Sequence, residues 1–262
     1  MHLRAASLLG LICCALGAAP ASTQDSTLFK ILKLDGNQVR WHMPRNGGRL
    51  VTWRLAAEPA EFPGARNCRK MTALDGLIAT SELEAATVRR EISAAFAMWA
   101  AVADITFQEA PEDTRADILI GAQIDPEGWA FADVFYDAAS PEPIKPISRA
   151  LVCLNPLKSW KVTFDGDLKT YDLRYTLAHE IGHAIGLDHP NGGGQIMGYR
   201  YEERFRALQP GDVRGAILLY GEPREAGVAV AAASERTDAL RASPARRFAK
   251  RWGTRAFTAR SP

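Results

Sequence analysis

The stretch that decides the fold is His179-Glu180-Ile181-Gly182-His183-Ala184-Ile185-Gly186-Leu187-Asp188-His189-Pro190. If residues 173–185 form a helix, His179 and His183 lie one turn apart on the same face. Gly186 can take the left-handed backbone that ends a helix, so that His189 can turn back towards the other two imidazoles. Three imidazole nitrogens that meet at one point leave a tetrahedral zinc ion with one open position, as in a catalytic site. The stretch therefore predicts zinc ligands at His179, His183 and His189.

Glu180 lies next to His179 and is the candidate general base. Its side chain points too far round the helix to join both histidines as a ligand, but it can accept a proton from a zinc-bound water. A water on zinc ionises near neutral pH and becomes a nucleophile, which predicts hydrolysis of an amide bond. A chance His-Glu-x-x-His pair without function is the alternative, and the glycine and the third histidine at fixed offsets count against it.

The run from His179 to His189 resembles the extended zinc signature of the metzincin metallopeptidases, whose second mark is a methionine on a tight turn beneath the metal. Met197 is similar to that methionine, and its distance of eight residues from His189 resembles the short spacing of the matrixins, the matrix-metalloproteinase-like branch. The resemblance implies an α+β fold. A twisted mixed sheet and two long helices would form an upper lobe, above a small lower lobe with a C-terminal helix.

The resemblance extends over about residues 50–221. Four further segments are similar to matrixin elements: residues 116–120 to the third strand, 129–132 to the edge strand beside the substrate, 151–160 to the strand and loop before the zinc helix, and 211–221 to the closing helix. The resemblance implies that Ala130 contacts a bound peptide through its backbone. It also implies that Tyr201 forms part of the specificity-pocket wall.

Two departures from the family pattern concern further metal sites. The positions at which matrixins hold a second, structural zinc read Phe131 and Cys153, so we expect one catalytic zinc and no structural zinc. Asn155 and Lys158 stand where the resemblance places calcium-binding carboxylates, and a lysine cannot bind a cation that requires oxygen ligands. Calcium binding therefore stays open.

A third departure lies around the methionine turn. Pro190 and Tyr199 resemble the serralysin and astacin pattern, in which such a tyrosine approaches the zinc. Tyr199 either assists the metal site or packs in the pocket wall, and we favour the packing. The sequence has no Gly-Gly-x-Gly-x-Asp calcium repeats, which excludes a full serralysin architecture.

The composition and the first residues predict one exported globular domain. The chain has 262 residues, of which 47% are hydrophobic and 24% charged. Residues 1–21 have the features of a secretory signal peptide: Arg4, an apolar stretch at 5–17, and the small-x-small sequence Ala19-Pro20-Ala21. This apolar stretch is too short to span a membrane, and no later one is long enough. We expect a secreted protein, periplasmic or extracellular, without a transmembrane segment.

Two of the four cysteines, Cys68 and Cys153, remain after removal of the signal peptide. They can form a disulfide in an oxidising compartment, which would tie the first loop to the strand that lacks its metal ligand. Alternatively, the Cys68 thiolate binds the zinc as a latency switch. The residues around Cys68 do not match the matrixin pro-segment motif, which disfavours the switch.

The remaining segments predict the order of the elements. Residues 22–48 contain a hairpin, 28–34 and 38–42 around Asp35-Gly36-Asn37, which is either a short pro-segment or an extra strand pair. The catalytic domain is expected over residues 49–221. Its elements are a strand at 49–55, a long loop at 56–79, a helix from the capping box Ser81-Glu82-Leu83-Glu84 to about residue 102, strands at 105–109 and 116–122, a loop at 137–148, the zinc helix after the N-cap Asp172, and a last helix from Pro210 to Gly221.

Residues 222–262 form a basic segment, with seven basic residues and no acid between positions 241 and 262. Their composition predicts a disordered tail. A charge run of this kind is commonly solvated, so we expect no specific nucleic-acid partner.

The sequence therefore predicts a monomeric, secreted zinc endopeptidase that binds a protein or peptide substrate along the sheet edge near Ala130. A catalytically silent, zinc-stabilised binding module is one alternative, and the intact Glu180 counts against it. A zinc amidase that acts on cell-wall peptides is another, and the candidate peptide-binding strand disfavours it.

Overall fold

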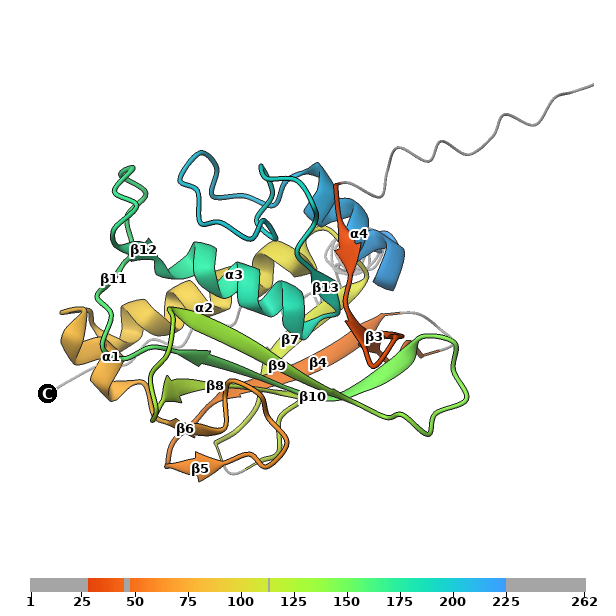
Figure 1. Cartoon of the computed structure of the whole chain (residues 1–262), viewed down its shortest axis with the longest axis horizontal. Helices are drawn as coiled ribbons and strands as arrows, with labels where there is room; N and C mark the ends of the chain where they lie inside the picture. Colours follow the sequence, from red (N-terminus) through yellow and green to blue (C-terminus); the bar gives the residue numbers. More distant parts are fainter. Residues whose placement is uncertain (1–27, 45–47, 113, 225–262) are drawn as a thin grey trace, which may run out of the picture. The chain divides into compact units, whose positions relative to one another are not determined.

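The computed structural model describes residues 28–44, 48–112 and 114–224. Its largest element is a mixed sheet of nine strands (Figure 1). Its strands are β2 (Lys33–Leu34), β3 (Asn37–Trp41), β4 (Arg49–Leu55), β5 (Ala60–Glu61), β6 (Lys70–Thr72), β7 (Ile105–Glu109), β8 (Ile118–Gln123), β9 (Ala130–Tyr136) and β10 (Lys145–Leu154). The order is β2-β3-β10-β8-β4-β7, while β9 pairs with β10, β6 with β8, and β5 with β6. Two short pairs complete the strands: β1 (Lys30–Ile31) with β13 (Leu187–Asp188), and β11 (Trp160–Lys161) with β12 (Tyr171–Asp172).

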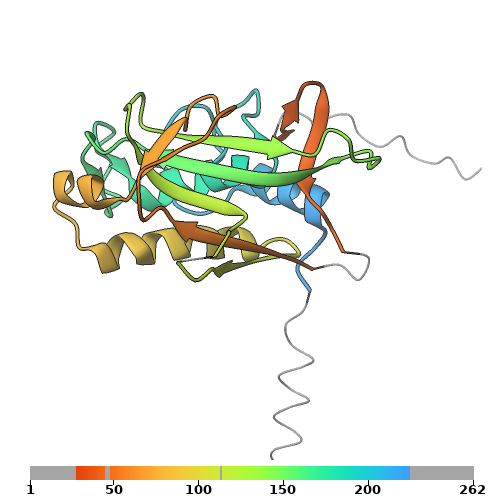
Figure 2. The ribbon, with the colours of Figure 1, turned by 90° about the horizontal axis from the view of Figure 1, so that it is seen from below.

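The helices are α1 (Asp75–Thr80), α2 (Ala85–Ala100), α3 (Leu173–Ala184) and α4 (Pro210–Tyr220). The long helices α2 and α3 lie on the same face of the sheet (Figures 1 and 2). Trp99 of α2 is fully buried, and its indole N–H donates to the Ala178 carbonyl of α3 at 2.9 Å. The predicted α+β fold with a mixed sheet is confirmed.

The zinc helix begins where the sequence predicted. Asp172 is the N-cap of α3, and its carboxylate accepts a hydrogen bond from the Tyr175 amide at 2.8 Å. The helix ends at Ala184, and Gly186 then takes a left-handed φ of 99°. That backbone turns the chain into β13, which is the reversal that the third histidine requires.

The hairpin near the N-terminus is an extra strand pair. β2 and β3 are antiparallel around Asp35 and Gly36, which have φ values of 49° and 81°. β3 then runs parallel to β10, while β1 pairs with β13. Trp41 at the end of β3 donates its indole N–H to the Ala184 carbonyl at 3.0 Å. The hairpin is therefore joined both to the sheet and to the end of the zinc helix.

Three predicted segment boundaries were wrong. The expected loop at 56–79 contains β5, β6 and α1. The expected capping box does not open α2, which begins only at Ala85. Ser81 ends α1 instead, and its hydroxyl accepts from the Trp160 amide at 2.9 Å. The expected loop at 137–148 is shorter, because β3 supplies a partner for β10 from Lys145 onwards. Each error arose because a distant segment supplied the contact.

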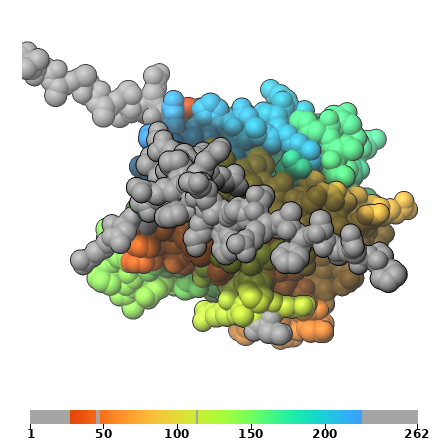
Figure 3. All heavy atoms as spheres, turned by 180° about the vertical axis from the view of Figure 1, so that it is seen from behind, coloured from red at the N-terminus to blue at the C-terminus, as the bar shows by residue number. Residues whose placement is uncertain are grey.

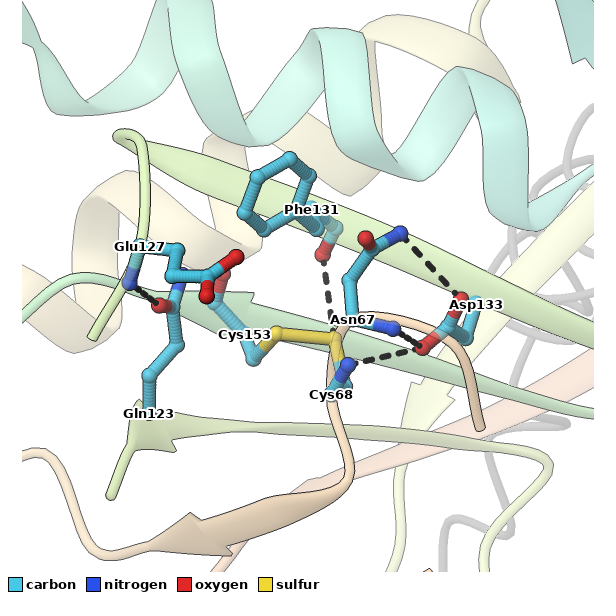
Figure 4. The surroundings of a disulfide bond; sticks show 7 residues. All are labelled: Asn67, Cys68, Gln123, Glu127, Phe131, Asp133 and Cys153. Atoms are coloured by element: carbon cyan, nitrogen blue, oxygen red, sulfur yellow. Dashed lines mark hydrogen bonds between the residues drawn. A yellow bond between two sulfur atoms is a disulfide. The ribbon is translucent and has the colours of Figure 1, made fainter. Parts of the chain in front are cut away.

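A disulfide joins Cys68 to Cys153 beneath the sheet, and both cysteines are fully buried (Figure 4). It ties the loop at residues 62–69 to the central strand β10. The alternative of a zinc-binding Cys68 thiolate is therefore wrong. Apolar side chains surround the bridge, among them Phe62, Met71 and Leu151.

The segment after Met197 lies beside the loop at residues 161–170 (Figure 3). The amide of Gly166 donates to the carboxylate of Glu203, and the Lys161 ammonium pairs with the same carboxylate at 2.7 Å. The two loops thus support each other near the start of α3.

In the described part of the chain, no helix combines the length and apolarity needed to cross a bilayer. The predicted signal peptide at residues 1–21 and residues 225–262 of the basic segment lie outside the described residues.

The turn after α3 gives a first test of the fold. A Cβ on Gly186 would lie 2.3 Å from the Val39 carbonyl oxygen, whereas a Cβ on Gly36, which also has a left-handed backbone, would meet nothing within 4 Å. We expect Gly186→Ala to lower the free energy of unfolding by about 2–5 kcal/mol through backbone strain and overpacking. Gly36→Ala should cost only about 1–2 kcal/mol from the backbone. Urea unfolding of the two variants checks this, and equal losses would contradict it.

Candidate active site

Three imidazoles converge at the end of the zinc helix. His179 and His183 project from α3, and His189 follows β13. The Nε2 atom of His179 lies 3.0 Å from that of His189, and the Nε2 atom of His183 lies 3.2 Å from each of the other two. Ligands on one tetrahedral zinc ion, at about 2.0–2.1 Å from it, lie roughly 3.3 Å apart. The three nitrogens therefore fit a single cation.

Backbone carbonyls fix the tautomers of two of these rings. The Nδ1 atom of His179 lies 2.7 Å from the Ile196 carbonyl oxygen, and that of His183 lies 2.8 Å from the Leu187 carbonyl oxygen. A carbonyl oxygen only accepts, so each Nδ1 donates its proton and each Nε2 keeps a lone pair that faces the centre of the cluster. A donor set of this kind suits zinc.

The protonation state of the cluster also suits a metal. Burial lowers the pKa of His179, His183 and His189. The mutual proximity of the rings lowers the pKa values of His179 and His183 further. The imidazoles are therefore neutral at pH 7, which is the form that binds a cation.

Glu180 lines the same cleft as the three histidines and is only 7% exposed. Burial, with a smaller contribution from the charge of Asp133, raises the pKa of the Glu180 carboxyl to about 8. A cation held by the imidazoles would favour the carboxylate and lower this pKa again. The ability of Glu180 to accept a proton therefore depends on the neighbouring cation.

The segment beneath the histidines is held by Asp212 of α4. Its carboxylate accepts from the amides of Ile196 at 2.8 Å, Met197 at 3.0 Å and Gln209 at 2.8 Å. Met197 is buried and packs closely on α3. Its sulfur lies so near Gly182 that a Cβ at that position would be only 2.2 Å away. Met197 thus forms an apolar floor below the imidazoles.

Comparison with known proteins identifies the family. The matrixin model of peptidase family M10 matches residues 76–221. The chain belongs to the matrixin family. Over 188 residues it is 29% identical to stromelysin-3 of Homo sapiens, an alignment that covers 63% of this chain and 36% of that protein.

Two further relatives come from a plant and a sea urchin. The chain is 29% identical over 195 residues to metalloendoproteinase 1-MMP of Arabidopsis thaliana, covering 69% of this chain and 50% of that protein. It is 28% identical over 161 residues to the hatching enzyme of Paracentrotus lividus, covering 56% of this chain and 25% of that protein. The alignments span between a quarter and a half of the length of these three relatives. As matrixins use a catalytic zinc, the three-histidine cluster has the donor set that the family requires.

The active-site cleft of this matrixin has a volume of about 1060 Å³. Ala130 lies in its wall, at the start of β9, and in the described residues β9 pairs only with β10. The other edge of β9 has no strand partner there. Tyr201 also lines the cleft, where its hydroxyl accepts from the Asp172 amide at 2.7 Å and donates to Glu203.

Tyr199 lines the mouth of the cleft and stays largely exposed. Its side chain is 81% exposed, and its ring meets the His189 ring edge-on with the centroids 5.2 Å apart.

An aromatic column in the cleft wall was missed from the sequence. Tyr171 stacks between Trp129, at 3.9 Å between ring centroids, and Tyr201, at 4.1 Å. Tyr175 meets the edge of Tyr201 at 4.9 Å. Tyr171 and Tyr175 are four residues apart near the N-terminus of α3, and this spacing was the one feature of the sequence that indicated an aromatic cluster there.

The N-terminal hairpin holds the segment that carries His189. The sequence predicted the hairpin but not this contact. The Lys30 ammonium pairs with Asp188 at 2.5 Å, and the Leu32 amide donates to the Gly186 carbonyl at 2.8 Å. Since Asp188 directly precedes His189, the hairpin helps to hold the third imidazole.

The positions that depart from the family's further metal sites have other roles. The sulfur of Cys153 is in the disulfide with Cys68. The side-chain amide of Asn155 donates to the Gly128 carbonyl at 2.8 Å, and the Lys158 ammonium lies 5.1 Å from the centre of the Trp129 ring. Among the residues described, the three histidines are the one group of at least three His, Cys, Asp or Glu side chains that could hold a metal.

Asp212 provides a test of the floor of the site. Asp212→Ala would leave three amides, two of them buried, without an acceptor, so we expect a loss of about 3 kcal/mol or more in the free energy of unfolding. Asp212→Asn keeps one oxygen acceptor and should lose less. Urea unfolding of both variants checks this order, and a larger loss for the asparagine variant would contradict it.

Proposed function

We propose that this chain is a secreted, zinc-dependent endopeptidase in which Glu180 is the general base. The observation that carries the proposal is the convergence of three Nε2 atoms in the cleft that Glu180 also lines, along an edge of β9 that has no strand partner in the described residues. Secretion fits the leader-like residues 1–21 and the Cys68–Cys153 disulfide, since disulfides persist in oxidising compartments. We assign residues 28–221 to the catalytic unit, because the hairpin is hydrogen-bonded into it.

His179, His183 and His189 would hold the zinc. When bound, zinc acts as a Lewis acid that polarises the scissile carbonyl and lowers the pKa of water. Glu180 accepts the proton that the attacking water loses and later delivers it to the amine nitrogen as the C–N bond breaks. One water is consumed for each peptide bond, and the carboxylate is restored at the end of the cycle.

The chain's own backbone orients the substrate. A peptide can add to the free edge of β9 as a further strand, beginning near Ala130, so that main-chain hydrogen bonds hold the scissile bond beside Glu180. Tyr201 then borders a pocket for a substrate side chain. Purified mature protein should cleave members of a proteome-derived peptide library, and a chelator should stop that cleavage.

Glu180→Gln tests the role of the base. The variant keeps the shape of the side chain but cannot take up a proton, so we expect kcat to fall by about 10²–10⁴-fold. Its zinc content, measured by atomic absorption after dialysis, should match that of the wild type. Near-native turnover in this variant would rule out Glu180 as the base.

His189→Ala tests the third ligand. Loss of a group that hydrogen-bonds to a metal ligand already weakens metal binding by about 10–100-fold. Removal of a ligand itself should therefore weaken zinc binding by at least about 100-fold. His42→Ala is the matched control, because His42 pairs with Glu142 at 2.9 Å and does not line the cleft. Competition with a chromogenic chelator measures both affinities. Equal affinities in the two variants would remove His189 from the ligand set.

A further inference from the structure

Two arginines line the cleft without an acidic partner. Arg66 and Arg200 are both exposed and both belong to the cleft wall. Within the part of the chain that the structure describes, neither guanidinium forms a hydrogen bond or an ion pair with another residue. Their charges therefore face the space that a substrate would fill.

None of the four acidic side chains of the cleft pairs with either arginine, and three of them are held by other donors. Asp35 accepts from the Tyr136 hydroxyl at 2.9 Å, Asp188 pairs with the Lys30 ammonium at 2.5 Å, and Asp133 accepts from the amides of Asn67 at 2.8 Å and Cys68 at 2.7 Å. The fourth, Glu180, is the proposed base. Both guanidiniums are thus left free to pair with a carboxylate of a bound substrate.

The backbone next to Arg66 is firmly anchored. Figure 4 shows the amides of Asn67 and Cys68 directed at the carboxylate of Asp133 on β9, and the disulfide from Cys68 to Cys153 on β10. Arg66 directly precedes these two anchored residues. The loop therefore presents Arg66 at the β9 side of the cleft.

Arg200 is presented by a different segment. It lies between Tyr199, which contacts the His189 ring, and Tyr201, which stacks on Tyr171 with centroids 4.1 Å apart. The hydroxyl of Tyr201 is also bonded to the Asp172 amide at 2.7 Å. The two arginines thus come from two anchored segments of the wall, far apart in the sequence.

We propose that Arg66 and Arg200 select peptides that carry aspartate or glutamate near the scissile bond. The inference rests on the proposed function and adds a substrate class to it. A guanidinium binds a carboxylate through paired N–H donors, which gives charge and geometry together. A substrate that covers the cleft shields these pairs from water and strengthens them.

The test compares two quenched fluorescent peptides with one cleavable sequence taken from the library. One peptide has glutamine on both sides of the scissile bond, and the other has glutamate at the same positions. We expect kcat/KM to be roughly 2- to 20-fold higher for the glutamate peptide, as for two partly exposed ion pairs. The preference should shrink at about 0.5 M NaCl, because salt screens such pairs.

The variants assign the preference to the two arginines. In the double variant Arg66→Gln and Arg200→Gln, the ratio of the two kcat/KM values should fall close to one. Arg69→Gln is the matched control, since Arg69 is exposed on the same loop but does not line the cleft, and it should keep the wild-type ratio. A thermal melt of each variant verifies folding. A wild-type ratio near one, or a ratio that survives in the double variant, would overturn the proposal.

Failure of the proposed function gives a different result, namely that neither peptide is cleaved in a chelator-sensitive way. Binding then still tests the charge preference. Fluorescence anisotropy of the same two peptides with Glu180→Gln protein should show tighter binding of the glutamate peptide, and equal binding would overturn the preference.

Discussion

Two hydrogen bonds from imidazoles to backbone carbonyls determine the geometry of the active site. The Nδ1 atoms of His179 and His183 donate to the carbonyls of Ile196 and Leu187, which turns both Nε2 atoms inwards. Both carbonyls belong to chain that follows α3. The helix alone therefore does not orient its own ligands, and the reversal at Gly186 must be in place before the cluster can close.

The sequence predicted the parts of this matrixin whose cause is local. Asp172 caps α3 through an amide three residues later, and Gly186 ends the helix through its own backbone. The spacing of the three histidines was also sufficient to place them on one point. Local periodicity and turn chemistry carry this information within about one turn of helix or one hairpin.

The parts that the sequence could not predict depend on partners far along the chain. Ser81 fits a capping box by its neighbours, yet the Trp160 amide takes its hydroxyl and α2 begins later. The column of Trp129, Tyr171 and Tyr201 joins three segments that no short pattern relates. Likewise, the ion pair of Lys30 with Asp188 could not be read from a hairpin motif. Tertiary contacts override local preference at such positions.

The packing of the N-terminal hairpin limits how far the chain can be trimmed from that side. A Cβ on Gly211 of α4 would lie 2.0 Å from the Leu28 carbonyl oxygen, so the backbone at Leu28 sits directly on the closing helix. A processing enzyme that cuts upstream of Leu28 leaves β1 on β13. A cut inside the hairpin would instead release the strand that braces the segment before His189. Trimming that keeps the β1–β13 pair and the Lys30–Asp188 ion pair must therefore stop before Lys30.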